Sequence, residues 1–149
     1  MQEHHYRNLF VMALMSFISM YILMYAMVDR LENVYSSVNQ VYMAGLMTAP
    51  MIVIELLIMR GMYHNGRLNA AIAIVSIVAG IAMFLCIRQQ AGVADRQFLR
   101  SMIPHHSGAI LMCEEANLQR AELRKLCQEI IASQQREIEQ MTAMLQDAR

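Results

Sequence analysis

The chain has 149 residues, of which 57% are hydrophobic and 16% are charged, and its twelve basic and twelve acidic side chains cancel. That hydrophobic fraction exceeds what ordinary soluble domains carry, so membrane-spanning segments are expected. The chain has no basic run and no excess of positive charge, which excludes a nucleic-acid partner.

Three uncharged segments follow one another in the first part of the chain, each about as long as the twenty residues that a helix needs to cross a bilayer. They cover about residues 8–28, 41–59 and 68–87. We therefore predict three transmembrane helices within a membrane region of residues 1–90, in a multi-pass integral membrane protein whose partner is the lipid bilayer.

The charges between these segments indicate an orientation. Arg60 and Arg67 lie in the short connection between the second and third segments, which the positive-inside rule places in the cytoplasm. Arg88, Arg96 and Arg100, after the third segment, argue the other way. We expect a cytoplasmic N-terminus and an extracytoplasmic C-terminal domain, with the bacterial inner membrane as the expected location.

Two features of the second segment have more than one interpretation. Met43, Met47 and Met51 are spaced about one helical turn apart, as a Cu(I) relay would need, but flexible packing is the commoner role of methionine. Glu55 is an ionisable group in an apolar segment. Such a group belongs either to a functional site or to an ion pair, here with nearby Arg60.

Beyond Gly92 the composition changes to mixed charges at helical spacing. Residues 93–117 and 121–147 read as two amphipathic helices with a short connection near residue 119, and Pro104 should bend the first. The C-terminal domain, residues 91–149, is thus a soluble helical hairpin. Because two helices cannot bury both their apolar faces alone, we predict an all-α, four-helix-bundle type of fold completed by homo-oligomerisation through the hairpin.

Candidate metal ligands gather on the first helix of the hairpin. At 100° per residue, Met102, His105, His106 and Met112 fall on one helix face. Thioether and imidazole donors select soft metals, and a methionine-rich set prefers Cu(I). This face therefore predicts a copper site, although the same spacing also suits an ordinary core stripe.

The second helix supplies further candidates. If the hairpin turns near residue 119, Cys127 lies level with Cys113, and Gln134 lies level with the two histidines. A buried Gln134 would orient an imidazole by hydrogen bonding. Met141 would lie within reach of Met102. The two cysteines are metal ligands, a disulfide across the hairpin, or inert small side chains.

The hairpin resembles the family known as domain of unknown function 305. The residues that carry the resemblance are Asp95-x-x-Phe98-x-x-x-Met102-Ile103-Pro104-His105-His106-x-x-Ala109-Ile110-x-Met112 and then Gln134-x-x-Glu137-Ile138-x-x-Met141. The resemblance covers roughly residues 93–145 and implies a ferritin-like helical fold that binds copper outside the cytoplasm. It also implies Met102, His105, His106 and Met112 as copper ligands, with Met141 as an addition. Cys113 and Cys127 are not part of the family pattern.

These observations lead to two functional hypotheses. The first is a membrane-anchored copper-binding protein for Cu(I) buffering, delivery or tolerance, which would exchange metal with a copper-trafficking protein or membrane complex. The second is an accessory or assembly subunit of a larger membrane complex, in which the histidines are structural core groups. We expect no enzymatic activity, because no E-x-x-H motif, nucleophile and base pair or phosphate-binding loop is recognisable.

Overall fold

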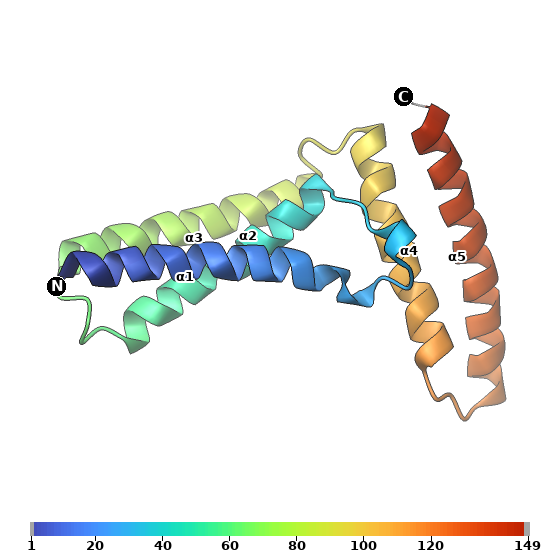
Figure 1. The fold of residues 1–149 in the computed structure, drawn as a ribbon, viewed down its shortest axis with the longest axis horizontal. Coiled ribbons are helices and arrows are strands. Elements are labelled where there is room, and N and C mark those ends of the chain that lie inside the picture. The colour runs from blue at the N-terminus through green and yellow to red at the C-terminus, as the bar shows by residue number, and fades with distance from the viewer. Residues whose placement is uncertain (1, 148–149) are drawn as a thin grey trace. The chain divides into compact units, whose positions relative to one another are not determined.

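The computed structural model describes residues 2–147, and all regular structure there is helical (Figure 1). The long helices are α1 (Gln2–Leu23), α2 (Val38–Ile58), α3 (Gly66–Gln89), α4 (Asp95–Glu115) and α5 (Ala121–Asp147). Two short 3-10 helices, η1 (Met24–Met27) and η2 (Leu31–Asn33), lie between α1 and α2. The predicted all-α fold, with three apolar helices before a two-helix hairpin, is confirmed.

Three helical stretches are long and apolar enough to cross a membrane, namely His4–Met27, Val38–Ile58 and Gly66–Gln89. Few of their residues are buried inside the protein, which is what helices surrounded by lipid would show. The second stretch begins a few residues before the expected start at 41, because the polar residues at its N-terminal end are also helical.

Helices α1, α2 and α3 form one compact unit. Small residues of α2 line its crossing with α3: Ala49 is buried, and a Cβ added to Gly80 would lie 3.1 Å from the Ala49 Cβ. A Cβ on Gly45 would meet the Met83 side chain at 3.2 Å. Apolar helices in lipid associate through such close packing of small residues.

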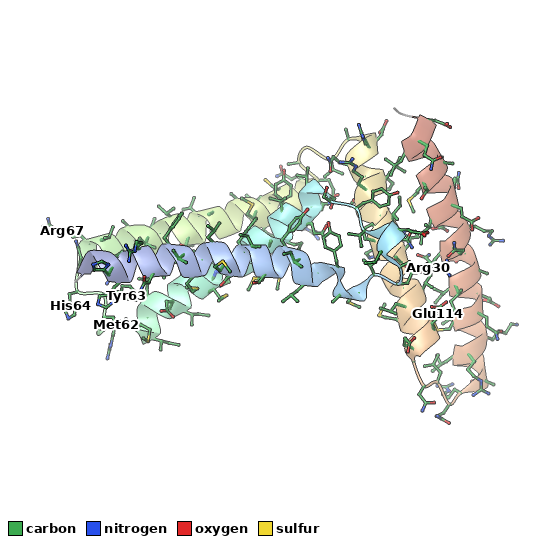
Figure 2. The ribbon with its side chains drawn as sticks, in the orientation of Figure 1. Arg30, Met62, Tyr63, His64, Arg67 and Glu114 are labelled. Carbon is green, nitrogen blue, oxygen red and sulfur yellow. A yellow bond between two sulfur atoms is a disulfide. The ribbon has the colours of Figure 1, made fainter. Side chains whose placement is uncertain are left out.

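Tyrosine side chains join α1 to the connection between α2 and α3. This connection carries Tyr63 and His64 (Figure 2). The Tyr6 hydroxyl donates a hydrogen bond to Asn69 Oδ1 at 2.7 Å, and its ring centroid lies 5.3 Å from that of Tyr63. Tyr63 in turn donates to Glu55 Oε1 at 3.4 Å. No ion pair joins Glu55 to Arg60 among residues 2–147, so the side-chain partner of Glu55 is Tyr63 and the pair with Arg60, one of the two interpretations, is not formed.

The second compact unit joins Tyr25–Val38 to the chain from Gly92 onward. The connection between α1 and α2 belongs to this unit because it packs on α4. Gln97 Oε1 accepts a hydrogen bond from the Val38 backbone N–H at 3.1 Å. A Cβ on Gly108 would lie 3.3 Å from the Met27 carbonyl oxygen, so glycine permits this close approach.

A buried carboxylate holds this connection on α4. Asp29 Oδ1 accepts hydrogen bonds from the Ser107 hydroxyl, the Asn33 amide and the Arg30 backbone N–H, while the Asp29 N–H donates to Ser107 Oγ at 2.8 Å. Burial by itself would raise the pKa of Asp29. The hydrogen bonds from Ser107, Asn33 and Arg30, together with the charge of Arg30, outweigh burial and lower the pKa below its usual 3.8.

This lowered pKa predicts a loss of stability in acid. A carboxyl group whose pKa is lower in the folded state stabilises that state fully above its unfolded pKa, and the contribution is lost as pH falls through the folded pKa. We expect Asp29→Asn to cost about 2 kcal/mol near neutral pH and to flatten the acid dependence below pH 3.8. Denaturant unfolding of the detergent-solubilised protein at several pH values measures both effects. Glu32→Gln, an exposed change in the same segment, is the control and should leave the acid dependence intact.

Candidate metal site

Helices α4 and α5 lie side by side and run in opposite directions (Figure 1). Their shared hydrophobic core consists of Ile103, Ile110, Ile138, Met141 and Leu145. The side chains of Tyr35, Leu99, Met102 and Ile131 pack against this core. Helix α4 continues through Pro104 as a single element. The core residues recur at helical spacing on both helices, which is why the amphipathic pattern predicted this hairpin correctly.

His106 is the buried histidine of the hairpin, with 7% of its surface exposed. Its Nδ1 lies 2.9 Å from the Met102 carbonyl oxygen, and its Nε2 lies 2.7 Å from Glu137 Oε2 on α5. Because a carbonyl oxygen can only accept, Nδ1 carries the proton of that hydrogen bond. Metal-binding histidines commonly use one nitrogen in this way, which leaves the other nitrogen directed at the ion. The geometry of His106 therefore makes Nε2 the candidate ligand atom.

The two thioethers nearest this histidine along the helices belong to the core. Met141 is 9% exposed, and Met102 is half-buried against the same hydrophobic cluster. Both residues therefore combine a soft donor with a packing role.

His105 and Met112 lie elsewhere on α4. His105 is exposed and its ring centroid is 6.0 Å from that of His106, while Met112 is 55% exposed. Consecutive residues are about 100° apart around a helix, so His105 and His106 point in different directions. The expected ligands are thus divided between the hairpin core and its surface.

Glu137, not Gln134, contacts the imidazole of His106. The sequence predicted that Gln134 would lie level with the histidines and orient the ring. Gln134 is half-buried on α5, but the contact is made by Glu137, one turn further along the helix. Glu137 stands at the edge of the apolar stripe, so its carboxylate approaches His106 from the side of the hairpin. The sequence signal that could have identified Glu137 is its place in the E-I-x-x-M pattern, directly before Ile138, which is buried.

Cys113 and Cys127 form a disulfide, with their Cα atoms 5.2 Å apart and a sequence separation of 14. The structure therefore shows one of the three interpretations of these cysteines and contradicts their role as thiolate ligands, because thiolates bind metals and bonded sulfurs have no free thiolate. The disulfide closes the end of the hairpin next to its connection. Cys86 of α3 is unpaired.

One side of the hairpin is covered and the opposite side is open. Tyr25–Val38 packs on the covered side. On the open side of α4, Phe98, His105 and Met112 recur every seven residues. On α5, exposed side chains on the side of Glu137 are spaced three, eleven and seven residues apart, which keeps them on one face of the helix. We call this surface the open face; its members are Phe98, His105, Met112, Leu123, Leu126, Glu137 and Met144.

The donor types around His106 fit a soft metal ion. An imidazole nitrogen and two thioethers suit Cu(I), and the Glu137 carboxylate brings a negative charge that balances a cation. Among residues 2–147, no three side chains of histidine, cysteine, aspartate or glutamate come together as a ligand group. A metal held here would therefore depend on methionine sulfur, on a further chain, or on both.

Comparison with known proteins extends the resemblance beyond the hairpin. Residues 79–145 match the family described as a domain of unknown function, DUF305, so the match begins inside α3. The chain is also 32% identical over 140 residues to "Uncharacterized protein L153" of Acanthamoeba polyphaga mimivirus, covering 92% of this chain and 90% of that protein. No solved structure gives a significant match. The chain belongs to the DUF305 family.

Proposed function

We propose that this protein is a membrane-anchored copper-binding protein that buffers, delivers or detoxifies Cu(I) through its C-terminal hairpin. The observation that carries the proposal is His106, whose Nδ1 is fixed on a backbone carbonyl while Nε2 faces Glu137. Beside it lies a core that contains Met141 and against which Met102 packs. The family membership is consistent with this role, and the donor set favours the reduced ion.

His106 and Glu137 would act together in binding and release. A cation would bind at Nε2 in place of the contact between that nitrogen and the Glu137 carboxylate, and the carboxylate would then balance the charge of the ion. Because 51% of the Glu137 side chain is exposed, the ion would have a route to and from solvent at the side of the hairpin.

The arrangement of the chain supports membrane anchoring by α2 and α3 together. Tyr25–Val38 precedes α2, and the hairpin follows α3, yet the two segments pack together. They lie on the same side of a membrane when α2 and α3 both cross it, and on opposite sides if only one does. The packing of Asp29 on Ser107 therefore agrees with a crossing by both helices.

The disulfide supports the proposed orientation. Disulfides persist in oxidising compartments and are rare in the cytosol, so a bond between Cys113 and Cys127 favours an extracytoplasmic hairpin. The N-terminus and the connection with Arg60 and Arg67 would then lie in the cytoplasm, as the positive-inside rule favours. Copper arriving from outside the cell would meet the hairpin first.

A direct metal titration tests the copper proposal. The full-length protein in mild detergent is titrated anaerobically with Cu(I) against a chromophoric chelator, using a reductant that leaves the disulfide intact. We expect tight binding by the native protein and its loss in the combined variant Met102→Ala, His105→Ala and His106→Ala. Arg136→Ala, on an exposed side of α5, is the matched control. Unchanged binding by the triple variant would refute the proposal.

The second candidate function is that of an accessory subunit of a larger membrane complex. The open face favours it, because exposed apolar surface on a helical hairpin marks a site for another protein. This alternative requires a co-purifying partner and no bound metal. Measuring the mass and the metal content of the same gently solubilised sample separates the two functions.

A further inference from the structure

The open face combines large apolar side chains with groups that can bind metal. Phe98, Met112, Leu126 and Met144 are each between 47% and 55% exposed, and His105 and Glu137 lie among them. At 100° per residue, the other charged residues of α5 fall outside this stripe. Depletion of charge around exposed apolar side chains is the composition of a protein interface.

Within its own compact unit this face is left uncovered, because residues 25–38 pack on the opposite side of the hairpin. Another polypeptide can supply the missing cover. A pair of helices that buries only one of its sides is completed by a second pair in four-helix bundles.

The chemistry of the face points to a second copy of this chain. A symmetric interface brings the same patch of both subunits together, so each group must find its complement on that same patch. The open face carries both members of one such pair: the imidazole of His105, which has an N–H that can donate a hydrogen bond, and the carboxylate of Glu137, which can accept one. Two copies packed face to face can place each His105 against the Glu137 of the other copy.

The positions of the metal donors also favour two copies packed through their open faces. Within one chain, His106 and Glu137 meet at 2.7 Å, but His105 points away from them to the surface of α4. We propose that two copies pair through their open faces and that each metal site is shared, with His106 and Glu137 from one copy and His105 from the other. This inference rests on the proposed copper function and predicts two equivalent sites per dimer.

Mixed dimers test the shared site. Two full-length chains with different affinity tags are co-expressed, one carrying His105→Ala and the other carrying His106→Ala with Glu137→Gln. Sequential purification in detergent isolates dimers that contain one chain of each kind. In a shared arrangement the first chain supplies His106 and Glu137, and the second supplies His105, so one complete site is restored. Each variant expressed alone has no complete site.

The expected result is one Cu(I) ion bound per mixed dimer with native affinity, while each variant alone binds at least about tenfold more weakly. If each site lay within one chain, the mixed dimer would bind no better than its parents, which would overturn the proposal. Failure of the native protein to bind Cu(I) would refute the copper function instead, and in that case the mass of the native protein would still decide whether the open faces pair.

A surface variant gives an independent check. Leu126→Glu places a charge on the open face without removing a ligand, and Gln140→Glu places the same charge on an exposed part of α5 outside that face. We expect Leu126→Glu to convert the dimer to monomer and to weaken Cu(I) binding at least about tenfold, with Gln140→Glu unchanged. A monomeric Leu126→Glu protein with native affinity would contradict the shared site.

Discussion

Replacing His106 by alanine is expected to weaken Cu(I) binding by more than about 100-fold, since even residues that only orient a ligand contribute 10-fold to 100-fold. The physical reason is the position of this ring. Its Nδ1 is held on the Met102 carbonyl, so Nε2 is presented at a fixed place beside Glu137. The chelator competition assay described for the native protein measures the change directly.

Gln134→Ala is the informative comparison for His106→Ala. Gln134 was the residue expected to orient the imidazole, but Glu137 makes the contact, so the Gln134 variant should retain native Cu(I) affinity. Circular dichroism should show native helix content for both variants, because the core of the hairpin is formed by other residues. A loss of affinity in Gln134→Ala equal to that in His106→Ala would contradict the assigned roles.

Removing the disulfide is expected to lower the free energy of unfolding of the hairpin by about 3 kcal/mol, the entropy of closing a loop of this length. The bond spans 14 residues and joins the end of α4 to the beginning of α5. The variant with Cys113→Ser and Cys127→Ser should therefore unfold at lower denaturant concentration. Denaturant unfolding of the full-length protein, followed by circular dichroism, measures the difference.

Cys86→Ser serves as the control for the disulfide, since Cys86 of α3 has no sulfur partner. A thiol reductant should destabilise the native protein and the Cys86→Ser variant equally, and should have no effect on the double serine variant. Equal stability of native and double variant proteins, with and without reductant, would show that the bond contributes nothing.

The secondary structure was accessible from the sequence because each signal is local. Twenty-residue uncharged segments predicted the three apolar helices, and the 3.6-residue apolar period predicted the two amphipathic ones. The placement of Cys127 level with Cys113 followed from the expected turn near residue 119, and the disulfide agrees with it. Rules that depend on neighbouring residues in the chain were sufficient for these features.

The site depended on contacts that local rules do not contain. A helical wheel placed His105 and His106 on one face, but the packing of α5 buried His106 and left His105 exposed. Glu137 was noted only as part of the family pattern, because its distance from the imidazole depends on how α5 lies against α4. The docking of Asp29 on Ser107 joins residues 78 positions apart, and no periodicity indicates such a pair.

The sequence by itself determined an all-α chain with three apolar helices, a C-terminal hairpin and a concentration of soft donors around His105 and His106. The tertiary structure alone decided that His106 is buried between Met102 and Glu137, that the two cysteines of the hairpin are bonded, and that Tyr25–Val38 covers one side of it. The reason is physical: hydrophobic periodicity specifies which side of a helix is buried, whereas the partner of a polar side chain is selected by the register and rotation of the helices that pack together.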